Sequence, residues 1–249
     1  MFAAIERAKQ GLSRKLAQVP AKVFAPQNLC LSELATALFP AISRPAILLL
    51  ESELLEDQEF HLAVNHRMLE RRGRQAMWNA WRKFLYIAVR LLKPQVVLET
   101  GVFDGLSSAA ILLGLHKNEE GHLTSIDLPA YATIEHSTNF MPDTTLPAGC
   151  EPGWVVPDWL RHRYTVHLGD SRQVLPRVLR ELRSIDIFFH DSLHTFDHMY
   201  FEYSSAWPLL KEGGLLLSDD TTWNPAFYKF CKEKKRRYYR LGGFGAVMK

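Results

Sequence analysis

One stretch near the middle of the chain restricts the fold more than any other, because it joins an apolar run to a glycine turn and a second apolar run. Three apolar residues precede Glu99, Gly101 and Gly105 stand four apart, and residues 109–115 are small or apolar. This order is typical of a buried strand, a tight turn and a helix. In an open α/β sheet, ligands bind beyond the carboxyl ends of the strands. We therefore predict that residues 99–105 cradle a ligand.

The turn matches neither of the common phosphate-binding patterns. A dinucleotide-binding turn follows G-x-G-x-x-G, and counting from Gly101 this chain has Phe103 and Leu106 at the two later glycine positions. A P-loop continues from its second glycine with Lys and then Ser or Thr, and Leu106 is not lysine. The carboxylate of Glu99 at the end of the strand also disfavours a polyphosphate. It suits a ligand that carries hydroxyl or ammonium donors.

Glu99, Gly101, Gly105 and Ser107 together form the pattern Glu-x-Gly-x-x-x-Gly-x-Ser. This pattern resembles the first motif of one branch of the class I S-adenosylmethionine (SAM)-dependent methyltransferases, a branch in which the lack of a glycine at Phe103 is normal. The resemblance implies that these four residues contribute to cofactor binding. It also implies that the turn at Gly101 passes close to the methionine part of SAM.

Composition and charge limit the partners that the chain can have. Its 249 residues are 47% hydrophobic and 23% charged, which is ordinary for a soluble globular protein and enough for one large α/β domain, with or without an appendage. A net charge of +3 is too small to indicate nucleic-acid binding. We find no apolar run near the roughly 18 residues of a membrane span and no secretory signal. The three cysteines form no metal-type pair or obvious disulfide framework, so we expect a reducing, cytoplasmic location.

The N-terminal part of the chain predicts helices without recognisable chemistry. Residues 1–55 are interrupted by four prolines, and residues 56–92 repeat apolar positions three and four apart. We interpret residues 1–75 as an N-terminal helical extension and residues 76–249 as the methyltransferase domain. Residues 1–16 mix basic and apolar side chains, which favours a surface helix over a transit peptide.

Asp127 ends the second predicted strand, residues 122–127, and lies 28 residues after Glu99, which fits one crossover. An acid at this strand end can accept hydrogen bonds from both hydroxyls of a ribose, whereas a simple turn cap is the alternative. The residues that follow, 128–158, are rich in proline and glycine. A loop of this length is often functional, so we expect a flap that helps to shape the acceptor pocket; a disordered insertion is the alternative.

Asp170 and Ser171 follow a third predicted strand, residues 164–168. In the family that the chain resembles, this turn faces the adenine. The resemblance implies that Asp170 accepts a hydrogen bond from the adenine amino group and that Ser171 adds another. Both residue types are also common at helix N-termini, and the two roles are compatible.

Three acids follow two further predicted strands. Asp191 comes after residues 185–190, and Asp219 and Asp220 come after residues 215–218. Because neighbouring parallel strands end at the same edge of a sheet, we expect these carboxylates to lie together, where they repel unless a cation lies among them. Oxygen ligands favour Mg²⁺ or Ca²⁺ over zinc. The sequence therefore predicts a metal held by Asp191, Asp219 and Asp220, with a bond to a backbone amide as the alternative role of Asp220.

The motifs after Asp191 extend the resemblance to about residues 96–227. Asp191 is followed by His194 and Phe196, where many relatives carry Asp-x-x-His-Ser-Tyr, and a later Ser-Asp-Asp supplies the paired acid. The resemblance implies that His194 is the base that removes a proton from an acceptor hydroxyl, with Asp191 in the catalytic and cofactor site. A histidine that is merely hydrogen-bonded to Asp191 is the alternative.

His190, His194 and His198 stand four apart and imitate the spacing of a zinc site on one helix. We disfavour zinc because His190 belongs to the fourth predicted strand rather than to the helix after it.

The last two strands are predicted at residues 238–241 and 245–248, on either side of Gly242 and Gly243. The predicted fold class is therefore α/β. It is a doubly wound, seven-stranded and mostly parallel sheet, as in the Rossmann-like methyltransferase fold, with an antiparallel last strand and an N-terminal helical extension.

These motifs predict a SAM-dependent methyltransferase that transfers a methyl group to a hydroxyl of a small molecule, with a divalent cation such as Mg²⁺ as an optional assistant. The alternative is a protein of methyltransferase fold that binds SAM or a partner without turnover. We expect a small-molecule acceptor and neither nucleic acid nor membrane as a partner. The sequence leaves open the acceptor and whether the protein forms a homo-oligomer.

Overall fold

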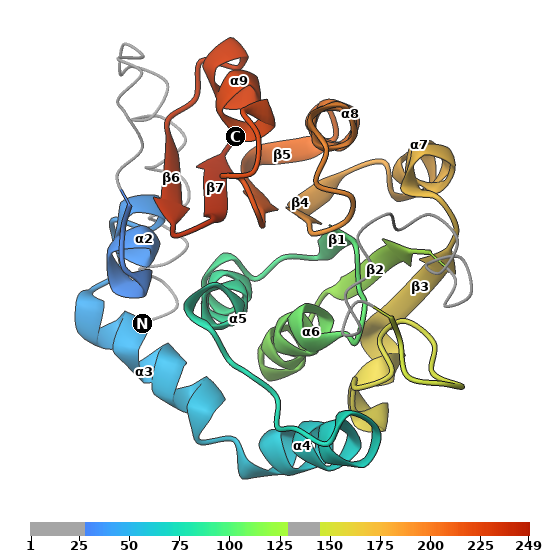
Figure 1. The fold of residues 1–249 in the computed structure, drawn as a ribbon. Helices are drawn as coiled ribbons and strands as arrows, with labels where there is room; N and C mark the ends of the chain where they lie inside the picture. Colours follow the sequence, from blue (N-terminus) through green and yellow to red (C-terminus); the bar gives the residue numbers. More distant parts are fainter. Residues whose placement is uncertain (1–27, 129–144) are drawn as a thin grey trace.

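Seven strands form one sheet at the centre of the computed structural model, which describes residues 28–128 and 145–249 (Figure 1). The strand order is β3-β2-β1-β4-β5-β7-β6. β1 to β5 pair in parallel, whereas β7 is antiparallel to both β5 and β6. The strands are β1 (Val96–Thr100), β2 (His122–Asp127), β3 (Tyr164–Leu168), β4 (Ile185–His190), β5 (Leu210–Ser218), β6 (Tyr238–Leu241) and β7 (Phe244–Met248). The predicted mostly parallel, seven-stranded sheet is confirmed.

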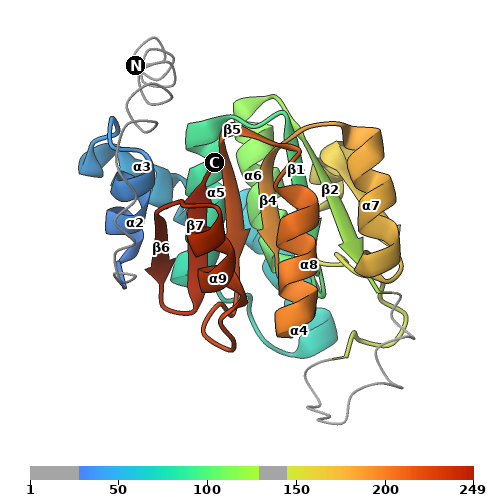
Figure 2. The ribbon, with the colours of Figure 1, turned by 90° about the horizontal axis from the view of Figure 1, so that it is seen from above.

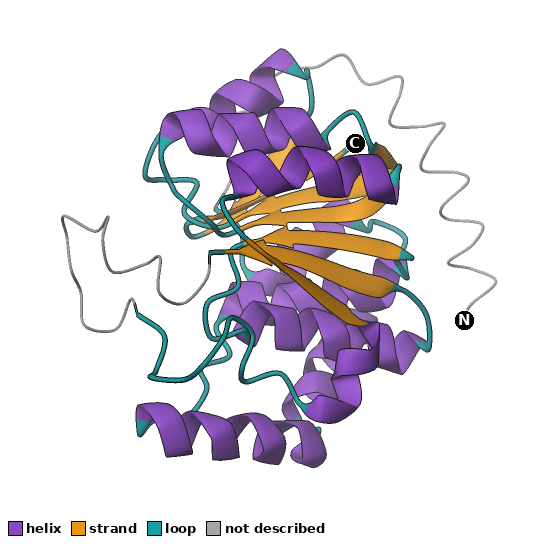
Figure 3. Cartoon of the chain, turned by 90° about the vertical axis from the view of Figure 1, so that its right-hand side faces the viewer, coloured by secondary structure: helices purple, strands orange, loops and turns teal. Residues whose placement is uncertain are grey.

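Helices cover both faces of the sheet, so the molecule has three layers (Figure 3). α5 (Ala80–Leu92) and α6 (Leu106–Asn118) lie on one face. α7 (Ser171–Leu182), α8 (Phe196–Ala206) and α9 (Ala226–Glu233) lie on the other (Figure 2). The strands serve both layers because their side chains alternate: Val97 and Phe189 pack with the first layer, and Leu98 and Phe188 with the second. This arrangement confirms the doubly wound class.

The N-terminal helices α2 (Leu31–Leu38), α3 (Arg44–Leu55) and α4 (Gln58–Arg72) join the layer of α5 and α6. Leu34, Ile47, Leu54 and Phe60 are fully buried in the same core cluster as α5, so these helices have no separate core. The division of the chain at residue 75 stays an interpretation of the sequence. The surface helix predicted at residues 1–16 lies outside the described residues.

The sequence pair Gly213 and Gly214, which is typical of the end of a helix, lies inside β5, which starts at Leu210. The register between β4 and β5 shifts near Ile185, and a glycine is common where a strand is irregular. Gly214 also lies close to the neighbouring strand, because a Cβ there would be 2.7 Å from the carbonyl oxygen of Asp186.

Five parallel strands end at one edge of the sheet, and the loops that follow them carry most of the predicted site residues. Residues 129–144 of the predicted flap lie outside the described part of the chain. Its other end leads into a short 3₁₀ helix, η3 (Asp158–Arg163). Across residues 28–128 and 145–249, no helix has the length and apolar character needed to cross a bilayer.

Candidate active site

The turn between β1 and α6, residues 101–105, is closely surrounded by backbone; we call it the glycine turn. Gly101 and Gly105 have φ values of +84° and +96°, a region that favours glycine. A Cβ on Gly101 would lie 2.0 Å from the carbonyl oxygen of Asp191, and one on Gly105 would lie 2.6 Å from Cα of Gly153. The two glycines therefore allow the loop after β4 and the segment around residue 153 to approach the turn.

Glu99 lies beneath the glycine turn rather than in an open cleft. Its side chain is fully buried and accepts hydrogen bonds from the hydroxyls of Ser107, Ser108 and Ser125 at 2.6–2.7 Å. Burial raises the pKa of Glu99 to about 7, although the three hydroxyl bonds oppose that rise. Glu99 thus connects the start of α6 and the middle of β2 to β1. The hydroxyl of Ser107 donates its proton to this connection.

Asp127 performs the turn-capping role that the sequence left as an alternative. Its Oδ2 accepts hydrogen bonds from the amides of Val102 and Phe103 at 3.0 and 2.7 Å, and its Oδ1 accepts one from Leu128 at 2.7 Å. Burial raises the pKa of Asp127, and these amides oppose the rise. A carboxylate offers about four acceptor positions, so Oδ1 keeps capacity for a ligand hydroxyl.

Asp170 and Ser171 have different surroundings. Asp170 is the N-cap of α7, and its Oδ1 accepts a hydrogen bond from the amide of Arg172 at 2.8 Å, which confirms the capping role. Ser171 is buried, and its hydroxyl donates to Glu202 at 2.5 Å. The adenine contacts proposed for both residues stay predictions.

The ends of β4 and β5 bring Asp191, His194, Asp219 and Asp220 together. Asp191 Oδ1 lies 3.6 Å from Nε2 of His194, and Asp220 Oδ2 lies 3.9 Å from Nδ1. Burial and the charge of Asp219 raise the pKa of Asp191 well above its ordinary value. Burial and the nearby His190 lower the pKa of His194 to about 4, so its imidazole is neutral near pH 7.

The loop around His194 is held from both sides. The amide of Asn224 donates to the carbonyl oxygen of His194 at 3.1 Å, and the ring of Trp223 lies 5.4 Å from the imidazole. Of the three histidines spaced four apart, His190 ends β4, His194 lies in the turn, and only His198 belongs to α8. The three histidines therefore do not share a helix face. The sequence predicted this, because it placed His190 in a strand.

The acids do not assemble a metal site in the part of the chain that is described. No three or more of the His, Cys, Asp and Glu side chains there are arranged to hold a metal ion, so the predicted set of Asp191, Asp219 and Asp220 does not form one. Burial raises the pKa of Asp219 to about 6. The nearby guanidinium of Arg82 also attracts Asp191 and Asp219.

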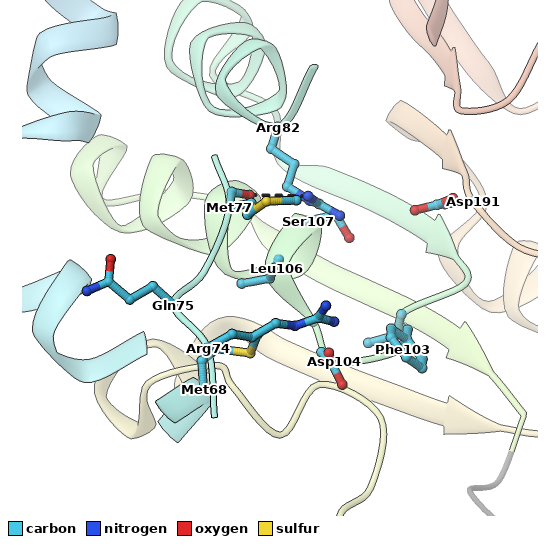
Figure 4. Close-up of a pocket in the computed structure, with 12 residues that line it drawn as sticks. Met68, Arg74, Gln75, Met77, Arg82, Phe103, Asp104, Leu106, Ser107 and Asp191 are labelled. Carbon is cyan, nitrogen blue, oxygen red and sulfur yellow. Dashed lines mark hydrogen bonds between the residues drawn. The ribbon is translucent and has the colours of Figure 1, made fainter. Parts of the chain in front are cut away.

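A cavity of about 170 Å³ adjoins the glycine turn and is lined by Arg82, Phe103, Ser107 and Asp191, among others (Figure 4). Arg82 points into it from the first turn of α5 and donates one hydrogen bond to the carbonyl oxygen of Met77 at 3.2 Å. Its Nε is buried and has no hydrogen-bond partner among the described residues. Burial lowers the pKa of Arg82.

Arg82 was missed in the sequence, although a signal for it exists. It lies at the edge of the buried apolar face of α5, one helical turn before Leu85 and two turns before Val89, where a charged residue interrupts the apolar pattern. A cation on an apolar face needs an anionic or polar partner, and this position marks the wall of the cavity.

The fold and this site define a class I methyltransferase: a seven-stranded, doubly wound sheet with a glycine turn after β1 and acids at the ends of β2, β4 and β5. A family model described as a methyltransferase domain matches residues 98–221, which run from β1 to just beyond β5. The chain therefore belongs to the class I SAM-dependent methyltransferases. A search of curated proteins finds no match.

Solved structures support the same fold. An O-methyltransferase from Bacillus cereus, in complex with S-adenosylhomocysteine (SAH), is 15% identical over 76% of this chain and 91% of that chain, with a TM-score of 0.54. TomG from Streptomyces achromogenes, an O-methyltransferase of tomaymycin synthesis in complex with SAM, is 17% identical over 79% and 92%, also with a TM-score of 0.54. SAH-bound methyltransferase PaMTH1 from Podospora anserina is 15% identical over 75% and 87%, with a TM-score of 0.52. At these identities the likeness shows a shared fold.

Proposed function

We propose that this methyltransferase transfers the methyl group of SAM to a hydroxyl group of a small molecule. The observation that carries the proposal is the neutral His194 beside Asp191. Asp191 itself lines the cavity next to the glycine turn. The O-methyltransferases with the same fold, which were solved with SAM or SAH, support the choice of cofactor and acceptor group.

The residues around the cavity fit SAM. The free Nε of Arg82, together with the amides at the start of α6, would hold a carboxylate, because a helix N-terminus and a cation both favour an anion. The remaining acceptor position of Asp127 would receive a ribose hydroxyl. When bound, SAM would supply an electrophilic methyl group on its sulfonium.

His194 supplies the base for this reaction. An alcohol attacks poorly until its proton leaves, and a positioned histidine that takes the proton contributes about 10²–10⁴-fold to the rate. We assign this task to Nε2, because it has no hydrogen-bond partner in the described chain and lies on the side of Asp191. At 3.6 Å the two side chains are not hydrogen-bonded to each other, so Nε2 is a buried acceptor without a partner among the described residues.

Metal assistance would require ligands beyond these acids, because no three His, Cys, Asp or Glu side chains of the described residues are arranged to hold an ion. Cytoplasmic location is supported by Cys30, Cys150 and Cys231, none of which is paired in a disulfide.

Two variants test the division of roles between cofactor binding and catalysis. We expect Asp127→Ala to raise the Kd for SAH by about tenfold or more, because it removes a ligand position and the cap of the glycine turn. We expect His194→Ala to leave this Kd within about threefold and to lower turnover by about 10²-fold. Calorimetric titration of SAH gives the affinities, and a labelled-methyl screen over small alcohols and phenols gives turnover.

Asp127→Asn is the matched control, since it keeps an acceptor oxygen for the turn amides. An equal loss of SAH affinity in Asp127→Ala and His194→Ala would contradict the assignment, and a wild-type protein that binds no SAH would refute the proposed function. Turnover that is unchanged by EDTA would exclude metal assistance, whereas turnover that depends on added Mg²⁺ would establish it.

A further inference from the structure

A fully buried carboxylate, Glu202 in α8, lies directly behind the candidate site. It accepts five hydrogen bonds from side chains, all within 2.9 Å. The donors belong to β1, to β4 and the turn after it, to α7 and to α8 itself; they are Thr100, His190, Ser192, Ser171 and His198. One side chain therefore connects the ends of three elements that form the site.

Glu202 is ionised in this environment. Burial by itself disfavours the charged form, but the hydrogen bonds from His190 and His198 outweigh it and hold the pKa of Glu202 well below its ordinary value. A buried charge costs stability unless its hydrogen bonds are satisfied, and an apolar group of the same shape is often as stable or more so. Such a network is therefore better explained by what it positions than by stability.

An ionised carboxylate can only accept hydrogen bonds, so the bond to Glu202 fixes the tautomer of His190. Glu202 Oε2 lies 2.6 Å from Nδ1 of His190, and Nδ1 must carry the proton. In the neutral ring Nε2 then carries no proton; this atom is buried and has no partner in residues 28–128 and 145–249. An unsatisfied buried acceptor is destabilising, and such groups are retained where they serve a function.

The ring of His190 contacts the ring of His194. Their centroids are 5.2 Å apart and their planes meet at 79°, a T-shaped contact. His190 itself is fully buried between this contact and a second T-shaped contact with Tyr203 at 5.4 Å. A rotation or a change of tautomer at His190 would therefore alter the position or the electrostatic environment of the His194 ring.

We propose that Glu202 is a positioning residue of the methyl-transfer site: it holds His190 in the Nδ1–H tautomer, and His190 in turn holds the ring of His194. The kinetic part of this inference rests on the proposed function, and the tautomer part does not. Ser192, which bonds to the other oxygen of Glu202 at 2.9 Å, fixes the turn that carries His194 in the same way.

Nitrogen NMR of the histidine rings in the full chain tests the tautomer directly. We expect wild-type His190 to carry its proton on Nδ1. In Glu202→Gln the new side chain has the same shape, but only one of its two terminal atoms accepts hydrogen bonds, and the other donates. The variant should therefore weaken the preference of His190 for this tautomer and change the ring signals of His194.

Kinetics test the consequence. We expect Glu202→Gln to keep its Kd for SAH within about threefold and to lose about tenfold or more of kcat, and we expect Glu202→Asp, which stays ionised, to recover part of that loss. Glu53→Gln is the matched control: Glu53 also bonds to a Tyr and an Arg through both oxygens, but in α3 and far from the site. This control should leave kcat unchanged.

Two results would overturn the inference. One is a proton on Nε2 of His190 in the wild-type protein. The other is a Glu202→Gln variant that changes the tautomer of His190 but leaves the signals of His194 and the value of kcat as in the wild type. If Glu202→Gln does not fold, the wild-type spectrum and Glu202→Asp still decide. If the wild type transfers no methyl group, the proposed function fails, and the NMR measurements alone judge the positioning role.

Discussion

Gly101 shows how the absence of a side chain can shape the site. The family pattern assigns this glycine to the cofactor turn, and the structure adds a reason that lies within the protein. Its Cα faces the backbone of Asp191, because a Cβ there would be 2.0 Å from the carbonyl oxygen and 2.7 Å from the amide nitrogen of Ser192. The glycine turn and the acid after β4 are thus held at contact distance.

We therefore predict that Gly101→Ala lowers the free energy of unfolding by about 2–5 kcal/mol, because it adds a backbone clash to a left-handed conformation. Urea denaturation measures the change. Gly73→Ala is the control: Gly73 also has a left-handed φ of +65°, but a Cβ there meets no described atom within 4 Å. Its cost should be only the backbone penalty of about 1–2 kcal/mol. Equal costs for the two variants would disprove the close-contact explanation.

At the scale of elements, α4 is fastened to the glycine turn. Arg72 in its last turn donates two hydrogen bonds to Asp104, at 2.7 and 3.1 Å, and its guanidinium lies 4.9 Å from the ring centre of Phe103. The indole of Trp154 also donates to Asp104 at 2.9 Å. The side chains of Arg72 and Asp104 are only 9% and 5% exposed, so this is a buried ion pair.

Breaking a buried pair leaves an uncompensated charge, which costs about 3–5 kcal/mol. We predict that Arg72→Met destabilises the protein by about this amount and weakens SAH binding, since the glycine turn loses its brace. Thermal unfolding and calorimetry measure the two effects. Arg177→Met is the control, because Arg177 pairs with Glu181 at 3.8 Å on an exposed surface and should change stability by about 0.5 kcal/mol or less. A similar small effect for Arg72→Met would show that α4 does not brace the turn.

At the scale of the whole molecule, α2, α3 and α4 share one core with the sheet. Ile47, Leu54 and Phe60 have no exposed surface, and the cluster that contains them also contains Val97 of β1 and Ile111 of α6. A division at residue 75 would cut through this cluster. One hydrophobic core usually unfolds as one cooperative unit.

We predict that the amides of Ile47, Leu54 and Phe60 exchange with solvent only through global unfolding, as the amides of β1 do. Native-state hydrogen exchange over increasing urea measures both groups. If the three amides instead opened at clearly lower free energy than β1, the N-terminal helices would form a separate unit, and the division at residue 75 would be supported.

The succession of strands along the chain and the acids at their ends could be predicted from the sequence, because both depend on local patterns. Apolar runs of strand length, glycines after β1 and polar residues at strand ends are visible one segment at a time. A parallel sheet then forces the ends of β1, β2, β4 and β5 to one edge, which is why Asp127, Asp191 and Asp219 were recognised together.

Only the tertiary structure decided what each side chain does there. Glu99 was expected to face a ligand, but Ser107, Ser108 and Ser125 surround it from two other elements. Arg82 and Glu202 are separated in the sequence from the residues they act on and belong to no motif. The direction in which a side chain points depends on packing between segments that are distant in the sequence, and a local pattern carries no information about that packing.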